Sequence, residues 1–203
     1  MNREERIINA IRPFVPNGTA EPLAARILKY RCQLTITRDR KTKAGDYRHP
    51  WGNHGHRISV NGSLNQYAFL ITFVHELAHL VNWEKHRSKV SPHGKEWKQT
   101  FKEEMQPFLT EKVFPKDVLT VLQTHMKNPK SATVRDQKLV RVLREYDEPN
   151  GHLLLDEIPQ GAEFEFSNRV FVKGEKLRKR FRCVESSTDR VYLISGIAEV
   201  KLC

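Results

Sequence analysis

Cysteine is scarce in this sequence of 203 residues, and the three that are present, Cys32, Cys183 and Cys203, stand far apart. An odd number of widely spaced cysteines without a C-x-x-C pair argues against a disulfide-stabilised fold. It also argues against a zinc site built from cysteine. Few and unpaired cysteines favour a reducing compartment.

Long apolar runs are missing as well. No stretch reaches the length that a helix needs to cross a bilayer. The first residues, MNREERIINAIRPF, mix charges with short apolar pairs and lack the apolar core and small-residue cleavage site of a signal peptide. We therefore expect a cytoplasmic protein without a membrane partner.

Acidic residues are outnumbered, with 24 Asp and Glu against 35 Lys and Arg, which gives a formal net charge of +11. Residues 151–203 hold 9 basic and 8 acidic residues, so nearly all of the excess lies in the first 150 residues. A basic field of this size favours polyanionic partners, nucleic acid first. A charged surface that serves solubility alone has the same composition.

Hydrophobic periodicity indicates a mixed first part. Apolar residues at three- and four-residue steps predict helices within residues 3–12, 19–30, 63–86, 91–109 and 114–126. Alternating apolar and polar residues predict strands within residues 33–38 and 57–62. The stretch 39–56 is rich in Gly, His and charge and reads as a loop or hairpin. Asn65 and Ser63 are alternative caps for the long helix.

A polar stretch that begins at residue 127 interrupts this pattern, and after Pro149-Asn150-Gly151 short alternating runs take over. We therefore predict a first domain over 1–126, a connecting segment over 127–150 and a small antiparallel β module over 151–203. Within the connecting segment, KLVRVLREY fits a helix or a strand. Within the module, KLRKRFR reads as a strand with a basic face.

The stretch FVHELAHLVNWEKH contains the pattern H-E-x-x-H, formed by His75, Glu76 and His79. Residues four apart lie on one face of a helix, so both histidines can bind one metal ion while the glutamate accepts a proton from water. Two histidines and a glutamate on a solvated helix face are the alternative. The apolar neighbours disfavour it, because an unpaired glutamate among them is costly. The pattern predicts a zinc site, and three protein ligands with one open position are the catalytic arrangement.

The third ligand is left open by spacing alone. The metzincin pattern would place a histidine where Lys85 stands, and His86 misses that register by one residue. The remaining candidates lie further downstream: His93, Glu96, Glu103 and Glu104.

The segments VHELAHLVNW and SPHGKEWKQTF together resemble the SprT family of zinc metallopeptidases, which is related to the Spartan DNA–protein crosslink proteases. The resemblance covers roughly Thr19 to Leu109. It implies that His75, His79 and His93 are the zinc ligands and that Glu76 is the general base. It further implies an α+β fold: a zincin-like catalytic domain of helices and a short antiparallel sheet, with the small all-β module added. The four-cysteine zinc ribbon of many relatives is absent here, which weakens the analogy for DNA binding.

The resemblance makes a zinc endopeptidase the leading hypothesis, with protein or peptide substrates that include proteins associated with or crosslinked to DNA. In this kind of fold the strand Arg57–Asn61 could pair with an extended substrate. The oxyanion partner is open between Tyr47, His54 and His56, which are otherwise surface loop residues. Trp83 and Trp97 are expected to pack in the core beside the zinc helix.

Two other functions compete with this one. The first is a nucleic-acid-associated binding protein with a structural or vestigial zinc site. The net charge of +10 in the first 150 residues and the unexplained β module motivate it. The candidate nucleic-acid contacts are basic and aromatic residues near the expected cleft, namely Arg38, Arg40, Lys41, Lys43, Arg48 and Trp51. A solvated hairpin explains the same residues. The second assigns residues 151–203 to the recognition of a partner protein. The sequence leaves the oligomeric state open.

Overall fold

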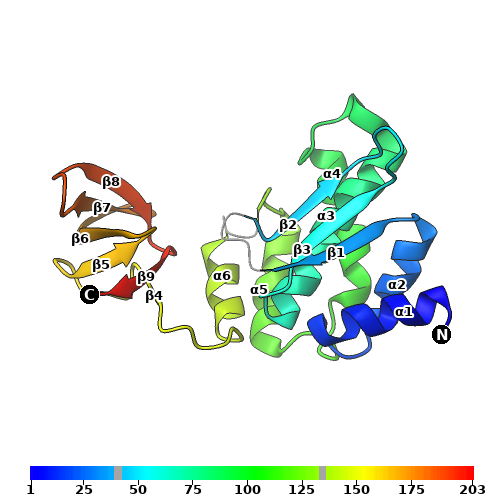
Figure 1. The fold of residues 1–203 in the computed structure, drawn as a ribbon, viewed down its shortest axis with the longest axis horizontal. Coiled ribbons are helices and arrows are strands. Elements are labelled where there is room, and N and C mark those ends of the chain that lie inside the picture. Colours follow the sequence, from blue (N-terminus) through cyan, green and yellow to red (C-terminus); the bar gives the residue numbers. More distant parts are fainter. Residues whose placement is uncertain (39–42, 133–135) are drawn as a thin grey trace. The chain divides into compact units, whose positions relative to one another are not determined.

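The structure is a computed structural model that describes residues 1–38, 43–132 and 136–203 (Figure 1). It divides into two compact units, Met1–Asp147 and Glu148–Cys203. The first unit combines helices with a small sheet and the second is built of strands, so the chain has the mixed α+β composition that its sequence predicts. Within the described residues, no helix combines the length and the apolar character that crossing a membrane requires.

The first unit contains the predicted helices, several of which end in a short 3₁₀ turn. Its helical elements are α1 (Arg3–Ile11), η1 (Arg12–Phe14), α2 (Ala20–Lys29), α3 (Gln66–His86), η2 (Arg87–Lys89), α4 (Lys95–Met105), η3 (Gln106–Phe108), α5 (Lys116–Lys127) and α6 (Gln137–Arg144). Helices α1 and α2 pack against each other, and α4 packs against α3.

The sheet of the first unit has the strand order β1-β3-β2, formed by β1 (Gln33–Thr37), β2 (Gly45–Arg48) and β3 (Arg57–Asn61). Strand β3 runs parallel to β1 and antiparallel to β2. The prediction of an antiparallel sheet was therefore wrong for one of its two pairs. After β1 the chain passes to the far edge to form β2 and then returns between the two, which sets β3 parallel to β1.

Helix α3 is the centre of the first unit and lies across one face of this sheet (Figure 1). Of the two predicted caps, Asn65 is the one used, because its side chain accepts from the backbone N–H groups of Tyr67 and Ala68. Twelve residues of α3 are buried. A helix that is apolar on nearly all sides belongs in a core, and this position fixes its polar residues inside the protein.

The first unit extends further along the chain than the expected boundary at residue 126. Part of the expected connecting segment is helix α6, whose Leu139 and Leu143 are buried in the same core as α3. Asp136 caps α6 and contacts His125 of α5 at 2.9 Å. Two leucines four residues apart suffice to attach this short helix, although the sequence around them is polar.

The second unit is a six-stranded sheet with the order β4-β9-β5-β6-β7-β8. Its strands are β4 (Leu153–Leu154), β5 (Glu163–Phe166), β6 (Arg169–Leu177), β7 (Arg180–Glu185), β8 (Val191–Ser195) and β9 (Glu199–Leu202), and these neighbours pair in antiparallel fashion. Phe164, Phe171 and Phe181 are buried in a core of its own. A separate core is what makes this segment a compact unit.

The basic run KLRKRFR is not one strand. Strand β6 ends at Leu177 and β7 begins at Arg180, and these two residues are paired across the hairpin. The turn residue Arg178 has a φ of 43°. The expectation of a single strand with a basic face was therefore wrong. The two-residue turn contains no Gly or Asn, so nothing in the sequence marks an interruption of the strand pattern.

Candidate metal centre

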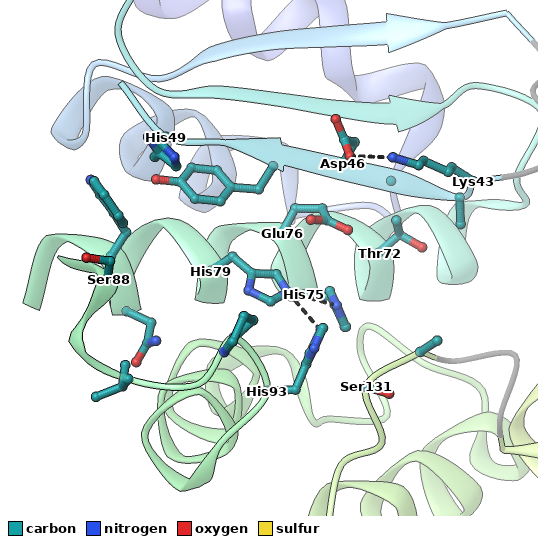
Figure 2. Close-up of a pocket in the computed structure, with 18 of the residues that line it drawn as sticks. Lys43, Asp46, His49, Thr72, His75, Glu76, His79, Ser88, His93 and Ser131 are labelled. Carbon is teal, nitrogen blue, oxygen red and sulfur yellow. Dashed lines mark hydrogen bonds and ion pairs between the residues drawn. The ribbon is translucent and has the colours of Figure 1, made fainter. Parts of the chain in front are cut away.

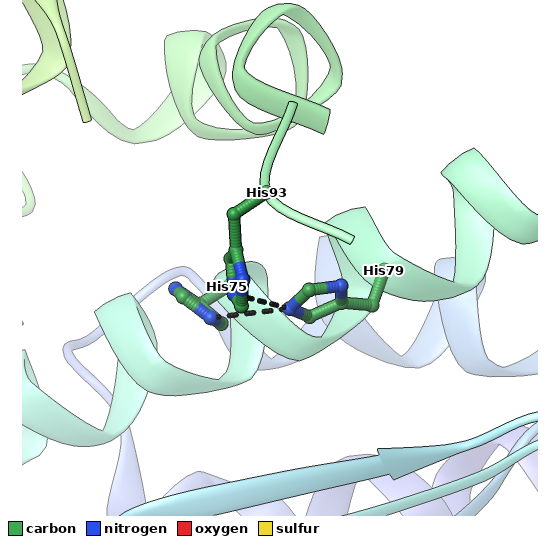
Figure 3. Close-up of side chains that lie close together, drawn as sticks. All are labelled: His75, His79 and His93. Atoms are coloured by element: carbon green, nitrogen blue, oxygen red, sulfur yellow. Dashed lines mark hydrogen bonds between the residues drawn. The ribbon is translucent and has the colours of Figure 1, made fainter. Parts of the chain in front are cut away.

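Three histidine side chains converge in the first unit (Figure 3). His75 and His79 project from neighbouring turns of α3, and His93 comes from the segment that leads into α4. Nε2 of His79 is 3.3 Å from Nε2 of His75 and 3.0 Å from Nε2 of His93. Their ligand atoms all lie within 4.8 Å of one another. The structure thus brings together the three residues that the resemblance predicted as metal ligands.

This group fits a zinc ion by donor type and spacing. Ligand nitrogens at about 2.0–2.1 Å from a tetrahedral zinc are roughly 3.3 Å apart, close to the separations of Nε2 of His79 from the other two rings. Burial, followed by the neighbouring imidazoles, lowers the pKa of His75 to about 3 and that of His79 to about 4. Both rings are therefore neutral at pH 7, the state that binds metal.

The other candidates for the third ligand have different partners. Glu104 forms an ion pair with Arg26 at 2.8 Å, and Glu103 accepts from Gln99 at 2.9 Å. Glu96 and His86 are not among the clustered donors found in the described ranges. Within residues 1–38, 43–132 and 136–203 the cluster has three donors, which leaves one coordination position open.

Trp97 of α4 forms the floor under the three imidazoles. Its ring centroid is 4.7 Å from that of His75, 4.8 Å from that of His93 and 5.2 Å from that of His79. It is fully buried, as the sequence predicted. His93 lies just before the start of α4, and Trp97 lies within that helix. The packing of α4 on α3 therefore places the ring of His93 against those of His75 and His79.

Trp83 was expected in the core, but it lines the cleft beside the metal group instead. The ring of His49 stacks on it with centroids 4.3 Å apart, and the guanidinium of Arg87 lies 5.8 Å from its centroid. An aromatic wall of this kind offers a flat apolar surface to a bound side chain.

Glu76 lies on the side of α3 that faces strand β2, and only 8% of it is exposed (Figure 2). The strand passes directly over it at Gly45. A Cβ atom at that position would lie 2.6 Å from Cγ2 of Thr72 and 2.9 Å from both Cγ and Oε1 of Glu76. Contacts this short cannot be accommodated without movement, so the glycine allows β2 to approach the glutamate.

The cleft that contains these groups has a volume of about 770 Å³. Strand β2 with its flanking residues forms one wall, α3 the floor, and η2 with the segment before α4 the opposite wall (Figure 2). Strand β3 was expected to bind substrate, and the structure contradicts this, because β3 is bonded on both sides. In the part of the chain that the structure describes, the strand edge left unpaired at the cleft belongs to β2.

Tyr47 of β2 lies against the metal group, its ring parallel to that of His79 with centroids 6.5 Å apart. Burial raises the pKa of Tyr47, so its hydroxyl stays protonated. That hydroxyl is hydrogen-bonded to Nδ1 of His56 at 2.9 Å, and Nε2 of the same ring lies 3.1 Å from the carboxylate of Glu84. Of the three oxyanion candidates, Tyr47 borders the cleft, His56 is buried, and His54 is exposed.

The residues predicted to contact nucleic acid are described in part, because Arg40 and Lys41 lie outside the described residues. Arg38 is exposed after the end of β1. Trp51 is 77% exposed, and its backbone pairs with that of His54 in a tight turn. Neither Arg38 nor Trp51 lines the cleft that contains the three histidines.

Lys43 and Arg48 stand on either side of Asp46 at the mouth of the cleft. Lys43 contacts one carboxylate oxygen at 2.9 Å (Figure 2). Arg48 contacts the other carboxylate oxygen at 3.0 Å. Part of the positive charge that the sequence suggested for phosphates is therefore used to balance a carboxylate.

Several residues of the cleft were not found from the sequence. Asn82 follows His75 and His79 on the same face of α3, so helical periodicity could have identified it. Gly45, Thr72 and Ser131 line the cleft from three different segments, and no spacing pattern connects them.

Residues 21–118 match the model of the SprT-like family. The protein named Protein SprT from Shigella dysenteriae serotype 1 (strain Sd197) is 36% identical over 100 residues, which cover 47% of this chain and 60% of that protein. Protein SprT from Enterobacter sp. (strain 638) is 63% identical over 101 residues, which cover 46% of this chain and 58% of that protein. The chain thus spans about three fifths of the length of these curated relatives. No solved structure matches the chain.

Proposed function

We propose that this protein is a zinc-dependent endopeptidase with a zincin-like catalytic domain, and the match of residues 21–118 to the SprT-like family supports the proposal. The convergence of three imidazoles beside a buried glutamate carries the proposal. His75, His79 and His93 would hold the zinc ion. Such an ion supplies a Lewis acid that polarises the scissile carbonyl and lowers the pKa of a water molecule toward neutrality.

Glu76 acts as the general base in this proposal. It takes a proton from the attacking water as the water oxygen bonds to the carbonyl carbon, and it delivers that proton to the amine as the C–N bond breaks. Its position between α3 and β2 supports this role, because the packing at Gly45 restricts where its carboxylate can move. Tyr47 is the candidate donor to the carbonyl oxygen, since it lines the same cleft and its hydroxyl is protonated. Donation to the substrate would replace the hydrogen bond of that hydroxyl with His56.

The substrate is an extended segment of protein that pairs with the free edge of β2. Main-chain hydrogen bonds to an edge strand bind a peptide largely independently of its sequence. The segment would lie along the cleft, with its side chains alternately toward Trp83 and toward the solvent. This arrangement suits an endopeptidase, because the cleft continues past the metal group along α3 from Thr72 to Trp83.

We further propose that the substrates include proteins associated with or crosslinked to DNA, in the cytoplasm. The resemblance to the Spartan proteases and the positive charge of the first 150 residues support this class. The free cysteines are compatible with a reducing compartment. The alternative, a nucleic-acid-binding protein with a structural zinc site, is less favoured because the donor cluster in the described residues has three members rather than four.

The test compares the zinc-loaded protein with Glu76→Gln on a DNA-binding protein substrate, with and without single-stranded DNA. General base catalysis contributes about 10²- to 10⁴-fold, so we expect a loss of that order in kcat with zinc content unchanged. His86→Ala is the matched control, because it removes a histidine of the same helix that lies outside the cluster.

Two results would contradict the proposal. One is equal cleavage by the wild type and Glu76→Gln. The other is zinc-loaded wild type that cleaves nothing while it binds DNA with a salt dependence that Glu76→Gln leaves unchanged. The second result would support the binding-protein alternative.

A further inference from the structure

Strand β8 is an edge of the sheet in the second unit, since it pairs with β7 and has no strand on its other side within residues 148–203. Its sequence, VYLIS, contains no charged residue and no proline. Val191 is 47% exposed and Leu193 is 52% exposed. Proteins usually protect a strand edge with charges, proline or a bulge, because an unprotected apolar edge pairs with other chains. An edge that lacks these devices is suited to binding a strand.

The hydrogen-bond pattern shows which backbone groups are available. The N–H of Glu185 donates to the carbonyl of Arg190, and the N–H of Gly196 donates to the carbonyl of Lys179. Bonded and non-bonded pairs alternate in an antiparallel ladder, so the backbone groups of Tyr192 and Ile194 face β7. Those of Val191 and Leu193 consequently face the free edge.

A cavity of about 440 Å³ lies beside this edge. The four consecutive residues Tyr192–Ser195 border it, so the cavity follows the strand rather than one of its faces. Phe166, Phe171 and Ala198 contribute apolar surface to its walls. A strand added to β8 would therefore place an alternate side chain at an aromatic pocket, the arrangement that gives strand addition its selectivity.

The wall of this pocket is already rigid. The guanidinium of Arg169 lies 4.4 Å from the ring centroid of Tyr192 and 5.0 Å from that of Phe171. It is fixed there by a 2.5 Å contact with Glu185. Because the side chains are ordered before a partner arrives, binding loses less conformational entropy.

Charge near the edge selects the partner. Arg180 and Arg182 of β7 are exposed and lie opposite Ser195 and Leu193 in register, and Arg180 also borders the cavity. The nearest carboxylate recorded for Arg182 is that of Glu175, at 3.8 Å. Exposed arginines beside an apolar edge favour acidic residues on an added strand and disfavour a second copy, which would bring the same cations together.

We propose that β8 binds an extended segment of a partner protein in which apolar and acidic residues alternate. The segment adds to the sheet through the backbone of Val191 and Leu193. One apolar side chain enters the pocket formed by Phe166 and Tyr192, and the acidic residues face Arg180 and Arg182. This surface is independent of the metal cleft, and it gives the second unit a role in recognising a partner protein.

The test uses the full chain and a labelled nine-residue peptide that alternates valine and glutamate around a central phenylalanine, with binding followed by fluorescence anisotropy. Leu193→Pro removes the N–H at the free edge and leaves the ladder to β7 intact. Leu193→Thr keeps that N–H and is the matched control. We expect about tenfold weaker binding for the proline variant and a smaller loss for the threonine variant. Arg180→Glu combined with Arg182→Glu should also weaken binding, which keeps the test valid if the proline variant does not fold.

Three results would overturn the proposal. In the first, the wild type fails to bind the peptide, or binds it as well when lysine replaces glutamate. In the second, the chain dimerises and Leu193→Pro abolishes the dimer, which would make a second copy the occupant. In the third, a single-stranded oligonucleotide displaces the peptide and binds more tightly, which would identify the arginines as a phosphate site.

Discussion

Among the described residues, each unit of this protein has a free strand edge beside a cavity: β2 in the first unit and β8 in the second. Strand β2 is polar, and Lys43 and Arg48 both contact the carboxylate of its Asp46. Strand β8 is apolar and exposes Val191 and Leu193. The main chain offers the same hydrogen-bonding groups in both cases. The two edges therefore differ in what lies next to them, and under our proposals that neighbour determines whether a bound strand is cut or only held.

In each unit a glycine allows two secondary-structure elements to approach each other closely. At Gly45 a Cβ atom would collide with Thr72 and Glu76, so the missing side chain lets β2 lie close to helix α3. At Gly174 a Cβ atom would lie 2.3 Å from the carbonyl oxygen of Arg182, beside the irregularity in the pairing of β6 with β7. The first glycine brings a helix with metal ligands under an edge, and the second brings two strands together. The same device thus permits close helix–strand packing in one unit and an irregular strand pair in the other.

The largest effect is expected when one residue of the proposed metal site is replaced. We expect His93→Ala to lower zinc affinity by more than the roughly 10- to 100-fold that loss of an outer-shell partner causes, because it removes a ligand itself. Peptidase activity should be lost with it, while binding of the alternating peptide at β8 is unchanged. The effect is measured as zinc content by atomic absorption, with His86→Ala as the control variant. Full zinc content in His93→Ala would show that the ligand set is different.

A smaller effect is expected when the distance between β2 and α3 is changed. Gly45→Ala should displace the strand from Glu76, and a misplacement of about 1 Å can cost on the order of 100-fold in rate. Zinc content should stay the same, since no ligand moves. Gly55→Ala is the control, because its Cβ would have no neighbour closer than 3.9 Å. Equal kcat values for the two variants would show that the approach of β2 to the glutamate is not needed.

The sequence predicted those parts of the site that local periodicity determines. Helix α3 has apolar residues at every turn, so its existence and the shared face of His75 and His79 followed from the letters. His93 was one of four candidates by spacing, and the resemblance to a family was needed to choose it. Its position depends on how α4 packs on α3, which is a contact between segments and leaves no local pattern.

Other parts could not be predicted because their signal is weak or absent. Strand β2 has the sequence GDYR, which reads as a loop, and its pairing with β3 is what makes it a strand. Helix α6 is held by Leu139 and Leu143 in a polar segment. The sequence predicts one strand where β6 and β7 form a hairpin, because the turn at Arg178 lacks the residues that usually mark a turn. In each case tertiary contacts outweigh local preference.

The smallest effect concerns the pocket beside β8 and uses pH. Contact with Arg169, followed by that with Thr188, lowers the pKa of Glu185 from 4.5 to about 2. A carboxyl group with a lowered pKa stabilises the folded state above its unfolded pKa, and this contribution is lost as the pH falls from about 4.5 toward 2. We expect Glu185→Gln to be less stable at pH 7 and to lose less stability on acidification, by a modest amount because the ion pair is partly exposed.

The three tryptophans, Trp51, Trp83 and Trp97, all lie in the first unit. Their fluorescence therefore follows the unfolding of that unit, while methyl NMR signals of Val191 and Leu193 follow the second. Glu185→Gln should change the acid dependence of the methyl signals and leave that of the fluorescence unchanged. If the methyl signals of the wild type and the variant lose stability in parallel below pH 4.5, the carboxylate does not fix Arg169. The pocket would then have to be ordered by its partner, and the advantage of β8 as a prepared binding edge would disappear.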